Sequence, residues 1–280
     1  MGGACVRRLL HDPGVTSEAP PFAILAPAAP WRPIVAHVPH ASTVIPPGVR
    51  AGILLDDEEL AAELVRLTDH GTDRLFAWLG GAGATRLVNG RSRLVVDPER
   101  FADDADEPMA AVGQGSVYTR TTDGRPLRAP DDAARATLIA GIFIPYHAAL
   151  TALVGEALDR AGECLVVDCH AFATAPLPSE ADQAPRRPDV CIGTDGFHTP
   201  SGLVAGLRDA LVVEGFRVAV DRPFAGSIVP GTWYRRDARV RSVMLEVRRG
   251  LYCDEATGEP TAAFDDVAAR LERAVRAAIG

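Results

Sequence analysis

The chain has 280 residues, 47% of them hydrophobic, and its formal net charge at pH 7 is −8. This length and apolar content predict one large hydrophobic core. The acidic balance argues against a general nucleic-acid-binding protein, because such proteins release counterions with clustered cations that this chain lacks overall.

All 29 basic residues are arginines, because the sequence contains no lysine. This excludes a Schiff-base lysine, a phosphate-loop lysine and a lysine general base. A site for an anion would have to use guanidinium groups, which suit carboxylates as bidentate partners.

The cysteines are odd in number and are nowhere spaced as C-x-x-C: they are Cys5, Cys164, Cys169, Cys191 and Cys253. This pattern disfavours a disulfide framework and a thiolate zinc site, and favours a reducing cytoplasm. The amino terminus lacks the apolar run of a signal peptide, and no run of about 18 uninterrupted apolar residues follows. We therefore expect a soluble cytoplasmic protein without a nucleic acid or a membrane as partner.

In chain order, residues 1–30 are rich in Pro, Ala and Gly and are predicted to form a loosely ordered lead-in to a single domain at 31–280. Strands are predicted at "PIVAHV", at "TRLVNGRSRLVVD" (a strand or a hairpin that turns at Asn-Gly), and at "CLVVDCH", "DVCIGT", "FRVAV" and "VRSVMLEV". Helices are predicted over 56–79, over 131–161 with a break or kink at Pro145, over 201–214 and over 263–279. Residues 101–128 and 174–188 are predicted to be loops, and a loop as long as the first is usually functional or disordered.

This alternation of strands and helices predicts an α/β fold with a mixed, mostly parallel sheet flanked by helices on both faces. In such sheets, ligands bind beyond the carboxyl ends of the strands. The ends of the predicted strands are therefore the places where functional residues are expected.

Four predicted strands end in polar residues that their apolar bodies do not explain: His40, Asp97, His170 and Glu246. Imidazole and carboxylate groups are suitable ligands for zinc, and a catalytic zinc ion usually has three protein ligands and a water molecule. A glutamate near such a site that is not itself a ligand can take a proton from that water.

Each of these residues also has a structural interpretation. His40 could be a core or loop histidine, and Asp69, in "LTDHGTDRLF", could be a helix cap or a solvated acid. His170 favours function more strongly, since it ends an apolar strand. The period of two along a strand places Cys169 on the face opposite Asp168 and His170, so a packing role is expected for this thiol.

Several arginines flank the same predicted strand boundaries: Arg91, Arg93, Arg100, Arg222, Arg248 and Arg249. Most arginines in any protein are solvated surface cations. Arg93 and Arg222 are the stronger candidates for contact with a substrate, because each lies at a boundary on the side where the pocket is expected.

The order of eight motifs resembles the N-formylglutamate amidohydrolase family: "VPHAS", "TDHGTDRLF", "NGRSRLVVDPER", "PYHAAL", "LVVDCHAF", "DVCIGT", "DRPFAGSIVP" and "LEVRRGLYCDE", over roughly residues 33 to 256. That family cleaves N-formylglutamate to formate and glutamate in histidine breakdown, and its fold is similar to that of zinc carboxypeptidases.

The resemblance implies a zinc cofactor held by His40, Asp69 and His170. It implies that Glu246 is the general base and later the proton donor, and that Arg93 polarises the carbonyl group or holds a substrate carboxylate. Substrate-binding roles are expected for four further residues near these motifs: Arg91, Arg100, Arg222 and His147.

The sequence departs from the family in three motifs. It has "PHAS" for "PHAG", "DPER" for "DLNR" and "DRPFAGS" for "NRPFKGG". The last two changes fall in segments expected to line the substrate pocket, and the third removes a cation. These departures leave the metal chemistry in place but put the identity of the substrate in question.

The resulting hypothesis is a zinc-dependent amidohydrolase that acts on a small N-formyl or short N-acyl amino acid, with an acidic amino acid expected, through a metal-activated water. The alternatives are a deacylase for larger acyl groups, a carboxypeptidase-like peptidase, and a noncatalytic binding protein on the same scaffold. The histidines His37, His70 and His147, together with Asp97, stay open between support of the site and plain structure.

Overall fold

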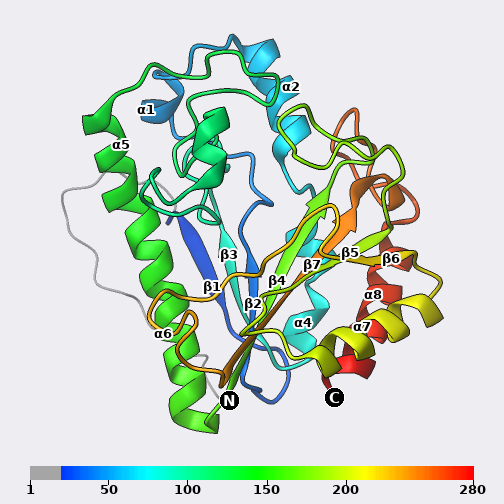
Figure 1. Cartoon of the computed structure of the whole chain (residues 1–280). Coiled ribbons are helices and arrows are strands. Elements are labelled where there is room, and N and C mark those ends of the chain that lie inside the picture. Colours follow the sequence, from blue (N-terminus) through cyan, green and yellow to red (C-terminus); the bar gives the residue numbers. More distant parts are fainter. Residues whose placement is uncertain (1–19) are drawn as a thin grey trace, which may run out of the picture.

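The computed structural model describes residues 20–280, which contain a seven-stranded sheet in the order β1-β3-β2-β4-β7-β5-β6 (Figure 1). The strands are β1 (Phe22–Leu25), β2 (Ile34–Val38), β3 (Thr85–Asn89), β4 (Cys164–Phe172), β5 (Val190–Gly193), β6 (Val218–Val220) and β7 (Val240–Arg248). The four neighbours β3, β2, β4 and β7 are parallel, whereas β1 pairs antiparallel with β3 and β5 pairs antiparallel with β7. The carboxyl ends of these four parallel strands therefore meet at one edge of the sheet.

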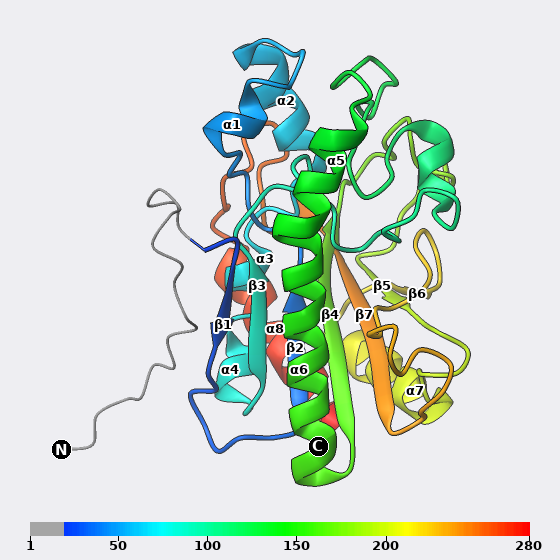
Figure 2. The ribbon, with the colours of Figure 1, turned by 90° about the vertical axis from the view of Figure 1, so that its left-hand side faces the viewer.

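Helices cover both faces of the sheet (Figure 2). They are α1 (Pro47–Arg50), α2 (Asp57–Leu67), α3 (Thr72–Leu75), α4 (Trp78–Gly81), α5 (Asp132–Leu138), α6 (Ile144–Ala161), α7 (Ser201–Val213) and α8 (Phe264–Ile279), with short 3-10 turns at Pro108–Val112 and Arg249–Leu251. Helices α3, α4, α7 and α8 pack on one face, and α6 packs on the other. The predicted α/β class, with a mixed, mostly parallel sheet between helices, is confirmed.

The period of two along β4 divides its side chains between these faces. Val167, Cys169 and Ala171 belong to the core under α7 and α8, whereas Val166 packs against α6. Cys169 is therefore a buried packing residue on the side away from His170, as expected. On the α6 side of β2 and β4, the polar residues His37, Asp168 and His170 follow the apolar residues Val35 and Val166 toward the carboxyl ends of the strands.

The helix predicted over 56–79 is wrong as one continuous element. Helix α2 begins at a capping box formed by Asp56 and Glu59 and ends at Leu67. Thr68 is extended and Gly71 has a φ of 73°, a left-handed conformation that glycine adopts at little cost. The chain then restarts as α3, and the interruption leaves Asp69 outside regular helix.

The hairpin interpretation of "TRLVNGRSRLVVD" is also wrong, and Asp97 does not end a strand. Strand β3 stops at Asn89, and both of its edges are already occupied, by β1 and by β2. The side chain of Asn89 donates to the carbonyl of Pro39 and accepts from the backbone N–H of Arg91, which directs the chain away from the sheet.

The helical stretch predicted over 131–161 is present, and a π-helical segment, Ile139–Phe143, separates α5 from α6 just before Pro145. Proline lacks the N–H that a regular helix would use, and such a segment accommodates the interruption. Asp132–Ala161 is long and apolar enough to cross a membrane by length and composition alone. This is weak evidence for a membrane span, since core helices pass the same test and α6 packs on the sheet through Tyr146, Leu150 and Val154.

The lead-in predicted for residues 1–30 falls partly outside the described residues, since these begin at residue 20. Within the described part, Phe22–Leu25 form the edge strand β1, which the sequence analysis missed. The strand is short and mostly exposed, so it has neither the burial nor the alternation from which a strand is recognised.

Candidate active site

A cavity of about 790 Å³ lies at the carboxyl edge of the sheet, and its lining includes His40, Asp69, His170 and Glu246. His40 follows β2, and His170 and Glu246 lie opposite each other in the register of β4 and β7. Helix α6 covers the same face further down, and its amino-terminal end contributes His147 to the lining. The cavity therefore occupies the part of this face that the helix leaves uncovered.

Three buried side chains, His40, Asp69 and His170, form a compact group in this cavity. Their ligand atoms lie within 4.8 Å of one another. Asp69 Oδ2 is 3.7 Å from Nδ1 of His40 and 3.2 Å from Nδ1 of His170, and the two imidazole centroids are 5.0 Å apart. Two imidazoles and a carboxylate are a donor set that suits zinc.

The other ring nitrogen of each histidine is held by a carboxylate. His40 Nε2 lies 2.8 Å from Asp97 Oδ1, and His170 Nε2 lies 2.9 Å from Asp168 Oδ1. An Nε2–H that donates to a carboxylate leaves the Nδ1 lone pair for a metal, which is how outer carboxylates orient metal-binding histidines. His40 Nδ1 is buried without a hydrogen-bond partner among the described residues, so the group fits a divalent metal.

Asp69 is placed by the interruption between α2 and α3. Its backbone N–H donates to the carbonyl of His40, its carbonyl accepts from the hydroxyl of Thr72, and its carboxylate accepts from the backbone N–H of Ala171. Burial alone would raise the pKa of Asp69, but the hydrogen bond with His170 and the nearby imidazole of His40 outweigh it, and the pKa falls below its usual range. The group therefore stays a carboxylate, the form that binds a metal.

Glu246 is a carboxyl group of the cavity lining whose pKa is raised. Burial, together with the neighbouring charges of Asp69 and Asp168, raises its pKa to about 8, against the opposing effect of His170 and Arg93. Its Oε2 is buried and has no hydrogen-bond partner among the described residues. A carboxyl group whose pKa is near neutrality can both accept and donate a proton.

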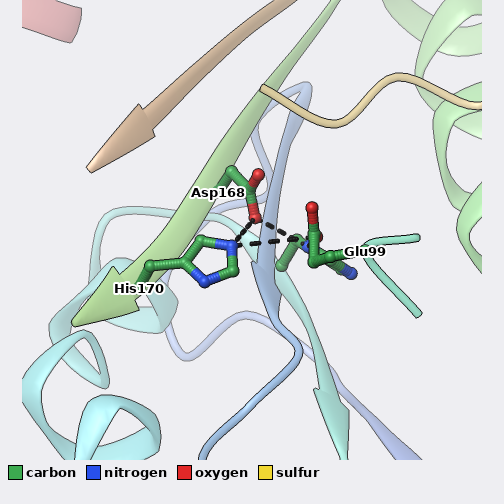
Figure 3. A group of neighbouring side chains, drawn as sticks. Glu99, Asp168 and His170 are labelled. Carbon is green, nitrogen blue, oxygen red and sulfur yellow. Dashed lines mark hydrogen bonds and ion pairs between the residues drawn. The ribbon is translucent and has the colours of Figure 1, made fainter. Parts of the chain in front are cut away.

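Behind the first group lies a second one, in which His37, Glu99 and Asp168 surround the other side of His170. Figure 3 shows Asp168 and His170 projecting from the same strand toward Glu99, which comes from a separate segment. His37 Nδ1 lies 2.8 Å from Asp168 Oδ1 and 3.0 Å from Glu99 Oε1. Burial would lower the pKa of His37, but the bonds to Asp168 and Glu99 outweigh it and raise the pKa to about 9.

The segment after β3 contributes two guanidinium groups to the lining of the cavity, those of Arg93 and Arg100. Arg93 donates to Asp97 Oδ2 at 2.8 Å, and the Tyr118 hydroxyl donates to the same oxygen at 2.6 Å. The Nη1 atom of Arg93 is 3.9 Å from Asp69 Oδ1. Arg100 also lines the cavity, and its Nε donates to the carbonyl of Gln114. These two guanidinium groups can meet an anionic part of a ligand.

The structure brings together most of the residues predicted for the site. His40, Asp69, Arg93, Arg100, His147, His170 and Glu246 all line the cavity. Arg91 is not among the lining residues; it is buried, and its guanidinium donates to the carbonyl of Gly90. Arg222 is also outside the lining; its side chain is 75% exposed and pairs with Asp182. His70 lies elsewhere, with Nε2 against the carbonyl of Val65.

From the sequence no role is predicted for Glu99 or Tyr118, although both line the cavity, and His37 stays open between support of the site and plain structure. Asp168 could have been found from its place two residues before His170, on the same face of the strand. The only signal for Glu99 was its place in "DPER", and Tyr118 lies in a long segment without periodicity.

An α/β sheet with a buried group of imidazoles and carboxylates under a cavity at its carboxyl edge is the arrangement of a hydrolytic enzyme, and the comparisons identify its kind. The family model for N-formylglutamate amidohydrolase matches residues 32–253. The chain belongs to the N-formylglutamate amidohydrolase family, whose members are hydrolases acting on amides.

Solved structures agree with this assignment. The chain is similar to the crystal structure of N-formylglutamate amidohydrolase from Ralstonia eutropha JMP134, with a TM-score of 0.81, 26% identity, and coverage of 93% of this chain and 98% of that one. It shares its fold with a gene product of Agrobacterium tumefaciens, with a TM-score of 0.67, 19% identity, and coverage of 94% and 97%. No curated protein sequence matches the chain.

Proposed function

We propose that this protein is a zinc-dependent amidohydrolase that cleaves an N-formyl or other short N-acyl amino acid, with N-formylglutamate as the reference substrate. The observation that carries the proposal is the convergence of His40, Asp69 and His170 beside a carboxyl group, Glu246, whose pKa is raised to about 8. Family membership supports the amide as the bond that is cleaved.

In this proposal His40, Asp69 and His170 would hold zinc. The bound ion would supply a water of lowered pKa and a Lewis acid for the acyl oxygen. Asp97 and Asp168, each within 2.9 Å of an Nε2 atom, orient both imidazoles with Nδ1 toward Asp69.

Glu246 moves the proton. It accepts one from the attacking water and returns it to the amide nitrogen as the carbon–nitrogen bond breaks, so that an amine leaves. Because water is the nucleophile, no covalent enzyme intermediate forms. The raised pKa of Glu246 suits both steps near neutral pH.

Arg93 and Arg100 bind the anionic parts of the substrate. Arg93 is anchored to Asp97 and lies close to Asp69, so it is positioned to stabilise negative charge on the acyl oxygen. Arg100 is the candidate for the substrate carboxylate.

A second candidate within the same chemistry is a deacylase for larger acyl groups, which the cavity volume of about 790 Å³ favours.

We also place the protein in the cytoplasm, because Cys164, Cys169, Cys191 and Cys253 are free thiols.

The test combines metal analysis with product detection. Purified protein is assayed for bound zinc and for formate release from N-formylglutamate and from other N-formyl amino acids, then stripped with a chelator and reloaded with zinc. We expect about one zinc per chain, loss of activity with the chelator and recovery with zinc. Protein that neither retains zinc nor gains hydrolysis on its addition would instead be a binding protein on this scaffold.

A further inference from the structure

We propose that the cavity accepts N-acyl amino acids with a single carboxylate and an apolar group, carried either by the amino-acid side chain or by the acyl chain. The inference rests on the proposed function and deepens it, since it concerns which substrate the same site prefers. It follows from the unequal distribution of apolar and charged side chains in the lining of the cavity.

Six apolar residues of the cavity lining come from β4, β7 and the segment after β6, and we call them the apolar wall: Phe172, Phe224, Ala225, Ile228, Val229 and Met244. Phe172 is two residues beyond His170 on β4, and Met244 is two residues before Glu246 on β7, so these four side chains share one face of the sheet. The segment after β6 supplies the rest, and the rings of Phe172 and Phe224 meet at 5.8 Å. This wall therefore directly adjoins the reacting groups.

The apolar wall offers no counter-ion to a second carboxylate. Met244 is opposite Asp168 in the register of β4 and β7, and the N–H of Ile228 donates to Asp168 Oδ2 at 3.2 Å. The guanidinium of Arg187 lies 5.6 Å from the Phe172 ring centroid but pairs with Glu180 and is not part of the lining. An anion placed against this wall would lie near the carboxylate of Asp168, and the guanidinium of Arg187 already pairs with Glu180.

The guanidinium groups that line the cavity come from other segments. Arg93 and Arg100 follow β3 and suffice for one carboxylate and the acyl oxygen. The Nη atoms of Arg249 donate to carbonyls of Val65, Arg66 and Thr68. Arg66 is half-exposed and pairs with Glu63. The second carboxylate of an N-acylglutamate would thus depend on Arg66, away from the apolar wall.

The size of the cavity supports the same conclusion. Its volume, about 790 Å³, is in the range of pockets that enclose drug-sized ligands, and N-formylglutamate is much smaller than such a ligand. An additional apolar group would displace water from the wall, and the burial of its surface would favour binding.

The first experiment measures kcat/KM of the zinc-loaded protein for N-formylleucine, N-formylalanine, N-formylglutamate and N-hexanoylglycine, by release of the free amino acid. We expect N-formylleucine or N-hexanoylglycine to exceed N-formylglutamate by about tenfold or more. N-formylleucine and N-hexanoylglycine distinguish an apolar side chain from an apolar acyl chain. A preference for N-formylglutamate over all the others would overturn the inference and leave the proposed function standing.

Two variants at the exposed residue Ala225 test the charge of the wall. Ala225→Lys adds a cation, and Ala225→Met adds a chain of similar length without charge. We expect the lysine variant to shift the ratio of kcat/KM toward N-formylglutamate by about three- to fivefold relative to the methionine variant. An equal ratio in the two variants would show that the wall does not contact the substrate side chain.

Binding separates this inference from the proposed function. Calorimetry on zinc-loaded Glu246→Gln protein measures the affinity for N-formylleucine and N-formylglutamate without turnover. Tighter binding of N-formylleucine, with a negative heat-capacity change, would support the apolar wall even if the protein hydrolysed neither compound. Equal or weaker binding would contradict it.

Discussion

His170 belongs to two neighbouring groups of imidazoles and carboxylates, and the two groups differ in how their nitrogens are used. Facing the cavity, His40 and His170 turn Nδ1 toward Asp69, and His40 Nδ1 has no hydrogen-bond partner among the described residues. On the far side, Asp168 accepts from both His37 Nδ1 and His170 Nε2, at 2.8 and 2.9 Å.

The comparison teaches that residue type alone does not distinguish a metal ligand from its support. Both groups contain histidine and carboxylate, and both are almost entirely buried. Each group also contains a buried ring nitrogen without a hydrogen-bond partner among the described residues, His40 Nδ1 in the first and His37 Nε2 in the second. What separates the groups is the cavity, because His40 and Asp69 line it and His37 does not.

The largest effect is expected from His170→Ala, since His170 is shared by both groups. We expect loss of bound zinc and a fall in turnover of about a thousandfold or more, because several kcal/mol of metal assistance would disappear. Zinc content and formate release measure this. Retention of one zinc per chain would place the metal elsewhere.

Glu246→Gln tests whether the carboxyl group beside His40, Asp69 and His170 transfers protons. The substitution keeps the shape but cannot accept the proton, so turnover should fall about 10²- to 10⁴-fold while zinc stays bound. Glu58→Gln, at an exposed position of α2, is the matched control and should behave as the unmodified protein. Loss of zinc in Glu246→Gln would make Glu246 a ligand instead.

Asp168→Asn weakens the connection between the two groups. The amide no longer holds His170 Nε2–H as an anion does, so zinc affinity should fall about 10- to 100-fold. Competition with a chromophoric chelator measures the change, with Asp57→Asn at an exposed site as control. Unchanged affinity would limit Asp168 to the structural partnership with His37.

The protonation of His37, in the second group, is expected to make the stability of the folded protein depend on pH. Its pKa rises from 6.5 to about 9 on folding, so its stabilising contribution is complete below pH 6.5 and is lost as the pH rises through about 9. Denaturant unfolding of metal-free protein should show the difference between the unmodified chain and His37→Asn shrinking across this range. A difference that stays constant from pH 6 to 9.5 would show that His37 is neutral in the folded protein.

The smallest effects are expected from two arginine substitutions, which compare Arg100 in the cavity lining with Arg222 outside it. Arg100→Ala should raise KM with little change in kcat, because it removes binding that is equal in the ground and transition states. Arg222→Ala should leave both constants within about twofold, since this side chain is 75% exposed and pairs with Asp182 outside the cavity lining. A large rise in KM for Arg222→Ala would mean that its loop closes over the substrate.

The sequence by itself determined most of the longer strands and helices and the candidates for the central site residues. Apolar runs such as "CLVVDCH" and "VRSVMLEV" predicted β4 and β7, because strands buried on both faces are apolar along most of their length and a polar residue near their end stands out. His170 and Glu246 could be selected for the same reason. Asp69 was named from the resemblance, although the periodicity placed it within a helix.

The tertiary structure decided those features that patterns of neighbouring residues do not predict. The edges of β3 were already paired, so "NGRSRLVVD" left the sheet and brought Arg93 and Asp97 to the cavity instead of forming a hairpin. The positive φ of Gly71 interrupted a helix that the periodicity continued, and this break placed Asp69 between two histidines. Ring-nitrogen partners, and the side of the cavity on which charges lie, depend on contacts between residues far apart in the chain, which a spacing rule over a few residues cannot contain.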